Sequence, residues 1–301
     1  MADLHDFETH RSYLTRLAYR MLGSVADAQD IVQEAYLRWH GSARQDVRQP
    51  RAFLSRIVTR LSLDSLKSAR RRRETYVGPW LPEPVVHETG FITEMLEDDP
   101  AEISIALMLA LEKLSPLERA SFILHDIFDV GFDEIAAIIN RNEAACRQLA
   151  ARARTHIRSE RPRFKPKEQE AGKFVQAFLL ASRQGDETAL RSMLAEDALL
   201  LTDGGGKKPS AINPLHGADR TSRFFTGFAR KNAFKLPEWH LPIEINGMPG
   251  FLSVEAGGTF QTTALDIQDG LITGIYVTRN PDKLKHLLHL VPDEIRQKLI
   301  D

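Results

Sequence analysis

Arginine and lysine side chains gather in two segments of the chain, and together they could bind phosphate groups. Residues 38–75 hold 11 basic and 3 acidic residues, residues 76–130 hold 2 and 11, and residues 131–166 hold 8 and 4. Cationic side chains that replace the counterions of a nucleic-acid backbone supply most of its non-specific affinity. Two basic segments flanking an acidic one therefore favour two DNA-contacting surfaces. Solvated helix faces are the alternative origin of each charge run.

A second set of side chains is of the type that moves protons. Asp203, His216 and His240 could act as general acids and bases if they met in one apolar pocket. Each residue singly is more typical of a surface position, so we assign no catalytic residues and expect no enzyme. Because Cys146 is the sole cysteine, a thiolate metal cage is excluded. Neither a metal nor a cofactor is predicted.

A chain of ordinary globular composition has to position these residues. It has 301 residues, a formal net charge of −1 and 43% apolar residues, which suggests two or three domains. No apolar run approaches the roughly 18 residues that span a bilayer. The acidic start, residues 1–6, is not a secretory signal. We therefore expect a cytoplasmic protein without a membrane contact.

Helical spacing dominates the first 75 residues. Apolar residues recur at i, i+3 and i+4 over residues 14–22, 28–39 and 53–61. Ser24 is the expected N-cap of the second helix, and Pro50 is the expected first residue of the third. The third helix should leave an outward, largely basic face consisting of Arg51, Ser55, Arg56, Thr59 and Arg60.

A short helix, a tight turn and a longer helix predict a helix-turn-helix near residues 132–158. Ser115, Pro116 and Glu118 mark the start of a preceding helix. Asn142 should cap the last helix, whose expected inner stripe is Ala145, Leu149, Ala153 and Ile157. Recognition helices enter the major groove end-first, so base contacts are expected from Glu143, Ala144, Arg147 and Gln148. Phosphate contacts are expected from Arg141, Arg152, Arg154 and Arg158.

The chain after Pro166 has α+β character. Helices are predicted near residues 174–181, 186–193 and 218–231. Strands are predicted at residues 240–246, 250–256, 259–267 and 271–278, with hairpin signals between them. We therefore expect a curved antiparallel sheet behind helices, an arrangement that resembles the SnoaL-like (NTF2-like) cone domain. This resemblance concerns the fold and does not establish chemistry.

The helical half resembles extracytoplasmic-function (ECF) sigma factors of the sigma-70 family. Residues 27–39 resemble the second helix of region 2, residues 50–54 and 64–73 resemble its promoter-contacting helix, and residues 114–158 are similar to region 4. The resemblance implies a factor that directs core RNA polymerase to promoters through the β′ clamp helices, the β flap, and promoter DNA at the −10 and −35 elements.

The resemblance also implies roles for individual residues. Polymerase binding is expected from Asp27, Asp30, Gln33 and Glu34. Contacts to the −10 element are expected from Arg44, Arg48, Ser55, Arg56 and Arg60. The helix-turn-helix would read the −35 element through Glu143, Ala144, Arg147, Gln148 and Arg152.

Three further motifs resemble the signature of one ECF subgroup with a fused SnoaL-like domain. They are Trp80-Leu81-Pro82-Glu83-Pro84, Asp203-Gly204-Gly205-Gly206-Lys207 and Asn280-Pro281-Asp282-Lys283-Leu284. The second motif lacks the spacing and the Lys-Ser/Thr end of a Walker A loop. The resemblance implies that the appended domain regulates sigma activity in cis through these residues. An unidentified small molecule is a further candidate ligand of the cone.

The expected organisation is therefore multidomain. Two all-α domains, residues 1–75 and 104–163, are joined by an acidic linker, residues 76–103, and are followed by an α+β SnoaL-like domain, residues 167–301. The alternatives are a one-component helix-turn-helix regulator with a ligand-binding cone, and a SnoaL-type isomerase or cyclase. The regulator has no use for the acidic face at residues 27–34 or for a second basic domain.

Overall fold

The computed structural model describes residues 2–41, 47, 49–86, 103–158 and 168–299. It divides into two compact units. The first unit contains residues 1–75 and 89–161, and the second contains residues 76–88 and 162–301. The proline-rich segment that follows the third helix therefore belongs structurally to the C-terminal unit.

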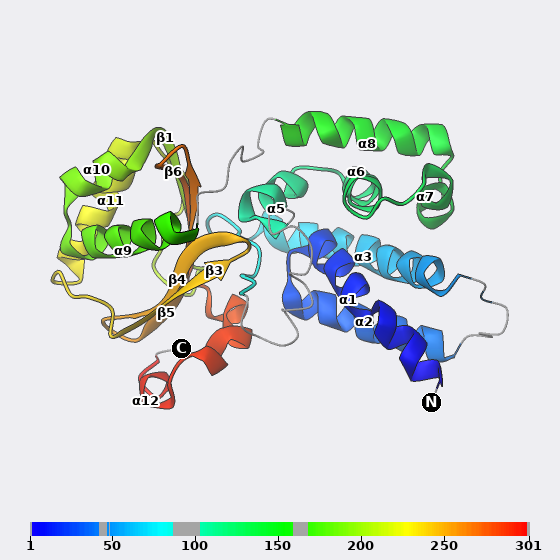
Figure 1. The fold of residues 1–301 in the computed structure, drawn as a ribbon, viewed down its shortest axis with the longest axis horizontal. Helices are drawn as coiled ribbons and strands as arrows, with labels where there is room; N and C mark the ends of the chain where they lie inside the picture. The colour runs from blue at the N-terminus through cyan, green and yellow to red at the C-terminus, as the bar shows by residue number, and fades with distance from the viewer. Residues whose placement is uncertain (1, 42–46, 48, 87–102, 159–167, 300–301) are drawn as a thin grey trace. The chain divides into compact units, whose positions relative to one another are not determined.

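The first unit begins with three helices that pack side by side (Figure 1), namely α1 (Ala2–Leu22), α2 (Val25–His40) and α3 (Pro50–Glu74). Ser24 caps α2 as predicted, because its Oγ accepts the backbone N–H of Asp27 at 3.1 Å. Pro50 is the first residue of α3, also as predicted. The buried stripe of α2 runs from Ala28 to Trp39, which faces the neighbouring helices.

A second group of helices completes this unit: α5 (Ile105–Glu112), α6 (Pro116–Phe122), the π-helical turn η3 (Ile123–Ile127), α7 (Phe132–Ile139) and α8 (Glu143–Arg158). Ser115 and Glu118 form the predicted capping box at the start of α6. Asn140 adopts a left-handed conformation at the end of α7, and Asn142 Oδ1 accepts the N–H of Ala145 at 2.8 Å. These features form the tight turn of a helix-turn-helix.

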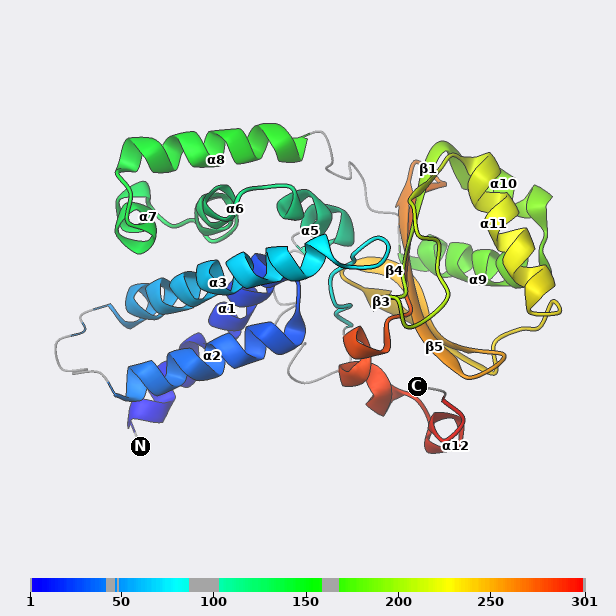
Figure 2. The ribbon, with the colours of Figure 1, turned by 180° about the vertical axis from the view of Figure 1, so that it is seen from behind.

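Three of the four expected inner residues of α8 are buried, namely Leu149, Ala153 and Ile157, whereas Ala145 is half-buried. Cys146 and Ala150 are fully buried in addition. The reason is that α8 packs against α5, α6 and α7 (Figure 2), so a single stripe of i, i+4 positions is too narrow to meet all three.

The two helix groups are joined by buried polar contacts. The guanidinium of Arg119 on α6 donates to Leu111 O and to Met21 O, each at 2.8 Å, and lies 2.5 Å from Glu112. The ring of Phe128 packs edge-on against Tyr13 on α1, with centroids 4.8 Å apart. The two predicted DNA-binding regions therefore form one packed body.

The second unit is a six-stranded sheet with helices on one face. Its helices are α9 (Glu168–Gln184), α10 (Glu187–Met193), α11 (Ala218–Lys231) and the short α12 (Asp293–Arg296), with 3₁₀ turns η4 (Pro281–Lys283) and η5 (Lys285–Leu290). Its strands are β1 (Leu194–Asp203), β2 (Leu215–His216), β3 (Trp239–Ile245), β4 (Met248–Glu255), β5 (Thr259–Gln268) and β6 (Leu271–Thr278), in the order β2-β1-β6-β5-β4-β3.

The sheet is mixed, which corrects the expectation of an antiparallel one. β1 pairs with β6 in parallel, because the two strands are joined by the long excursion through α11 and β3–β5 rather than by a hairpin. The other pairings are antiparallel, as the hairpin signals predicted. The expected fold class, helical sigma regions followed by an α+β cone, is confirmed.

Both faces of this sheet are buried. Phe251, Leu265 and Ile275 pack on the inner face with Phe178 of α9 and Phe225 of α11. Alternate residues turn to the outer face, as in any strand. There the chain's own segments cover the sheet with the buried side chains of Leu81, Val85, Val86, Leu284, Leu287 and Val291. The 76–86 segment is thus an integral part of the C-terminal unit.

Replacing Arg119 tests the joint between the helix groups. The Arg119→Met variant leaves Met21 O and Leu111 O without their buried donor and Glu112 without its cation. We expect its free energy of unfolding to fall by about 3–5 kcal/mol in urea titrations of the full chain. Arg38→Met is the matched control, because Arg38 pairs with Glu34 on the surface and should change stability by at most about 1 kcal/mol. Equal losses in both variants would contradict this role of Arg119.

Candidate functional site

The predicted polymerase-binding residues lie together on the outer side of α2. Asp30 and Gln33 are exposed, and Asp27 and Glu34 are half-buried beside them. Leu37, one turn after Gln33, is 58% exposed and adds an apolar side chain to this acidic surface. Sequence reasoning missed Leu37, although its position outside the buried stripe of α2 was a visible signal. The face combines charge with an exposed apolar group, as protein-binding surfaces often do.

On α3 the structure separates residues that were predicted together. Arg56 and Arg60 are exposed, but Ser55 is buried, where its Oγ donates to Arg51 O at 2.7 Å and lies 3.2 Å from the Tyr13 hydroxyl. Thr59 is buried as well, so the outward placement of Ser55 and Thr59 is wrong. Arg60 donates through Nε to Ile138 O of α7 at 3.2 Å. The Arg60 contact shows that α7 packs on this part of α3, whereas Ser55 is buried against Tyr13 of α1. Arg44 and Arg48 lie outside the described residues.

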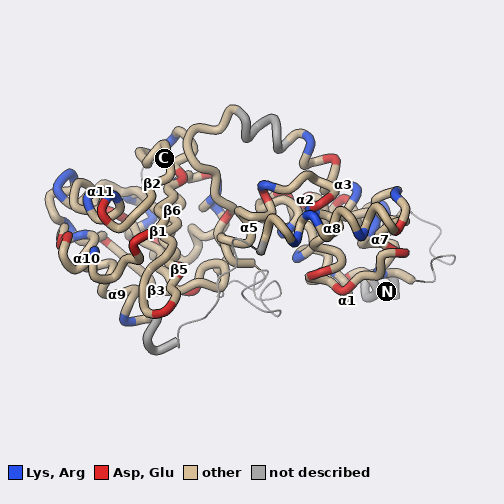
Figure 3. The backbone as a smooth tube through the Cα atoms, turned by 90° about the horizontal axis from the view of Figure 1, so that it is seen from above, with Lys and Arg blue, Asp and Glu red and all other residues tan. Residues whose placement is uncertain are grey.

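The N-terminal turns of α8 present the predicted base-reading residues to solvent. Glu143, Ala144, Arg147 and Gln148 are all exposed. The guanidinium of Arg147 lies 2.8 Å from Glu143 and over the ring of Phe132. Basic positions recur along this helix (Figure 3).

The predicted phosphate-binding arginines of α8 are held by carboxylates of the same unit. Arg152 lies 2.8 Å from Glu118, and Arg154 lies 2.5 Å from Asp126. Ion pairs between partly exposed groups contribute little stability, so a phosphate group can replace such a carboxylate at small cost. The described structure therefore leaves α8 able to present an arginine-rich surface to DNA.

The three C-terminal motifs meet at the carboxylate of Asp203. We call Tyr76, Leu81, Asp203, Asn280 and Lys283 the motif cluster. Asp203 Oδ1 accepts the Tyr76 hydroxyl at 2.5 Å, and Oδ2 accepts the Leu81 N–H at 2.9 Å and lies 2.7 Å from Lys283 Nζ. Lys283 also donates to Leu81 O, and Asn280 donates to the Tyr76 hydroxyl at 2.8 Å. Asp203 is fully buried, and Lys283 is 7% exposed.

Tyr76 is the member of the motif cluster that sequence reasoning missed. Burial, with the adjacent Asp203 carboxylate, raises the pKa of its hydroxyl far above the ordinary value, so Tyr76 stays a donor. The glycines of the second motif make room for it. A Cβ on Gly205, whose φ is +59°, would lie 2.2 Å from Asn280 Nδ2 and 3.0 Å from the Tyr76 hydroxyl. Gly205 is therefore required by close approach and by backbone conformation.

Contacts around the motif cluster hold the rest of the 76–86 segment on the sheet. The half-exposed ion pair of Lys207 with Asp282, at 2.5 Å, joins the second motif to the third and not to this segment. His286 Nε2 lies 2.8 Å from Pro84 O. Val86 forms a β-bridge with Ile245, and Val85 N donates to Asn246 Oδ1 at 3.0 Å. All three predicted motifs are thus brought together in one unit.

The residues considered for proton transfer are kept apart. Asp203 faces the motif cluster. His216 lies exposed on β2, and His240 lies exposed on β3. Since β2 and β3 are the opposite edges of the sheet, the two imidazoles do not share a pocket. Within the described ranges no group of three potential metal ligands gathers, and no helix is long and apolar enough to cross a bilayer.

Comparison with known proteins defines the class. The model of Sigma-70 region 2 matches residues 7–72, and that of Sigma-70, region 4 matches residues 104–157. The helical unit therefore has the two regions of sigma-70 factors.

Relatives of similar length narrow this class. The chain is 38% identical over 291 residues to the ECF RNA polymerase sigma factor SigJ of Mycobacterium tuberculosis, with 93% of each chain covered. It is 31% identical over 294 residues to the probable ECF sigma factor SigI of that species, covering 93% of this chain and 94% of SigI. The SigJ crystal structure matches 94% of this chain and 98% of its own with a TM-score of 0.76 at 34% identity. The chain belongs to the ECF RNA polymerase sigma factors.

Removing the charge of Asp203 tests the motif cluster. Asp203→Asn leaves the Lys283 ammonium buried without a counter-charge, so we expect the C-terminal unit to lose about 3–5 kcal/mol of unfolding free energy. The amide proton of Leu81 should exchange faster in hydrogen–deuterium exchange of the full chain.

The control is Asp282→Asn, which removes a half-exposed pair with Lys207 in the same neighbourhood. This variant should cost at most about 1 kcal/mol and leave the Leu81 amide protected. Unchanged exchange of Leu81 in Asp203→Asn would show that Asp203 does not hold the segment.

Proposed function

We propose that this sigma factor is held in a closed, inactive state by its own C-terminal unit, and that it initiates transcription after opening. In the open state α2 binds the β′ clamp helices through the face containing Asp30, Gln33 and Leu37. Region 4 binds the β flap, α3 and its preceding loop contact the −10 element, and the first turns of α8 read the −35 element.

The packing of region 4 on region 2 is the observation that carries this proposal. The Nε of Arg60 on α3 lies 3.2 Å from the backbone of α7. The two promoter elements are about 25 base pairs apart, which is about 85 Å of duplex at 3.4 Å per pair. Helices in direct contact do not reach both elements, so the two regions have to separate first.

The motif cluster is well placed to oppose that separation. Glu74 is the last residue of α3, and Tyr76 is already bonded to Asp203. While residues 76–86 are docked, α3 and α5 are joined by the fixed span of this segment and about 17 further residues, which add a reach of at most about 60 Å. Undocking frees about 28 residues and extends the reach to about 95 Å. Docking of this segment therefore favours the closed state.

Transcription in vitro tests this proposal. With core polymerase and a promoter library, Asp203→Asn and a truncation after Lys165 should yield more promoter-dependent transcript than the full chain. A coupling of about 1–3 kcal/mol corresponds to roughly a 5–150-fold increase. Asp282→Asn is the matched control and should resemble the unaltered chain. An undocked segment with unchanged transcription would contradict cis inhibition, and no transcript from any form would contradict initiation itself.

Two arginines of α8 separate sequence reading from general DNA affinity. Arg147→Ala should relax the preference for one −35 sequence, because Arg147 is at the N-terminal end that meets base edges. Arg154→Ala should weaken binding to all sequences alike and lower the salt dependence, because Arg154 would hold a phosphate. Fluorescence anisotropy with matched and scrambled −35 duplexes at several salt concentrations measures both. Equal loss of specificity in the two variants would contradict the assigned helix face.

A further inference from the structure

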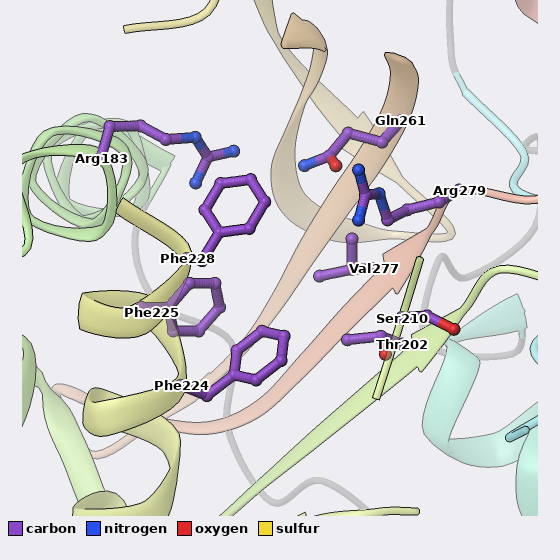
Figure 4. A pocket seen from close by; sticks show the side chains of 9 residues that line it. All are labelled: Arg183, Thr202, Ser210, Phe224, Phe225, Phe228, Gln261, Val277 and Arg279. Atoms are coloured by element: carbon purple, nitrogen blue, oxygen red, sulfur yellow. The ribbon is translucent and has the colours of Figure 1, made fainter. Parts of the chain in front are cut away.

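A pocket on the inner face of the C-terminal sheet is distinct from the motif cluster. It lies between α11 and strands β1, β5 and β6, and the empty space along its lining, open solvent included, is about 310 Å³. Figure 4 shows three phenylalanine rings of α11 on one side and the polar ends of Gln261 and Arg279 on the other. Thr202 lines this pocket while its neighbour Asp203 points to the outer face, as strand alternation requires.

The two guanidinium groups of the pocket differ in how they are satisfied. Arg183 is 2% exposed and makes a bidentate pair with Glu255, at 2.9 Å and 2.6 Å, and a bond to Ser182 Oγ at 2.9 Å. Arg279 donates through one terminal nitrogen to Pro209 O, but its buried Nε has no partner among the described residues. Burial lowers the pKa of Arg279, and the nearby Glu255 carboxylate opposes this shift.

Gln261 adds a second polar group to the lining. It is 3% exposed, and its side chain lines the pocket. A buried guanidinium N–H that lacks an acceptor costs free energy, so native structures rarely leave one empty. Both groups line the same small space, where a ligand acceptor could bind them.

The opposite wall is apolar. Phe224, Phe225 and Phe228 of α11 line the pocket, and the ring of Phe228 lies 5.2 Å from the Arg183 guanidinium and 5.8 Å from that of Arg279. A ligand in this space meets hydrogen-bond donors at one end and aromatic rings at the other.

We propose that this pocket binds a small monocarboxylate with an apolar body, such as a single aromatic ring or a short alkyl chain. The carboxylate accepts from Arg279 and Gln261, and the body packs on the phenylalanines. A guanidinium suits a planar carboxylate. Since Glu255 neutralises Arg183, the pocket has one uncompensated positive charge, which fits a monoanion better than phosphate. The proposal concerns binding and does not depend on the closed state of the sigma regions.

The proposed carboxylate binding is tested by calorimetric titration of the full chain with sodium benzoate and with sodium butyrate. Both should bind, and benzamide, which has the shape of benzoate without its charge, should bind at least about tenfold more weakly. Inorganic phosphate should not compete. No binding of either carboxylate up to about 10 mM, or equal binding of benzamide or phosphate, would overturn the proposal.

Substitutions in the pocket lining test which residues bind the carboxylate. Arg279→Met should weaken benzoate binding about tenfold or more, and Gln261→Leu, which keeps the side-chain volume, should weaken it about threefold to tenfold. Arg223→Met is the control, because Arg223 lies exposed on the same helix as the phenylalanines and pairs with Asp219. If the Arg279→Met variant does not fold, the benzoate affinity of the Gln261→Leu variant decides whether the assignment holds. Unchanged affinity in folded variants of both residues would overturn the assignment.

Discussion

The buried ion pair between Asp203 and Lys283 is the contact on which the C-terminal unit depends. Desolvating two charges is costly, and the cost is offset only when every polar atom around them is paired. Here the carboxylate accepts from Tyr76, Leu81 and Lys283, while the ammonium also donates to Leu81 O. Each of these partners comes from a segment far away in the chain. The pair therefore specifies one docked position of residues 76–86 rather than adding general stability.

The helical unit uses arginines in a related way. Arg119 donates to Met21 O and Leu111 O, in the last turns of α1 and α5, and Arg60 donates to Ile138 O in the last turn of α7. Carbonyl groups at helix C-termini have no partner within the helix and carry partial negative charge. Across the two helix groups, Arg119 meets this need for Met21 O of α1, and Arg60 meets it for Ile138 O of α7. These polar contacts, together with the ring contact between Tyr13 and Phe128, join the two helix groups.

Local sequence signals predicted where the helices begin better than they predicted which side chains are buried by tertiary contacts. The caps at Ser24, Ser115 and Asn142 and the first helical residue Pro50 were correct, because capping depends on side chains within one turn. The burial of Ser55 and Thr59 was not predictable, since it depends on tertiary packing, such as the contact of Ser55 with Tyr13 of α1. Tyr76 and the parallel pairing of β1 with β6 were missed for the same reason. The three sequence motifs indicated which segments belong together, but they did not indicate that the carboxylate of Asp203 joins them.

The division of the chain into two units has a consequence for its synthesis. The helical unit is complete once residue 161 has been made, whereas the outer face of the C-terminal sheet needs residues as late as Val291 to cover it. At about 5–20 residues per second, a ribosome needs about 6–26 s to add residues 162–291. Residues 76–86 leave the ribosome long before the surface on which they dock exists. Every newly made molecule therefore passes through an interval in which the helical unit is complete and the sheet on which residues 76–86 dock is not.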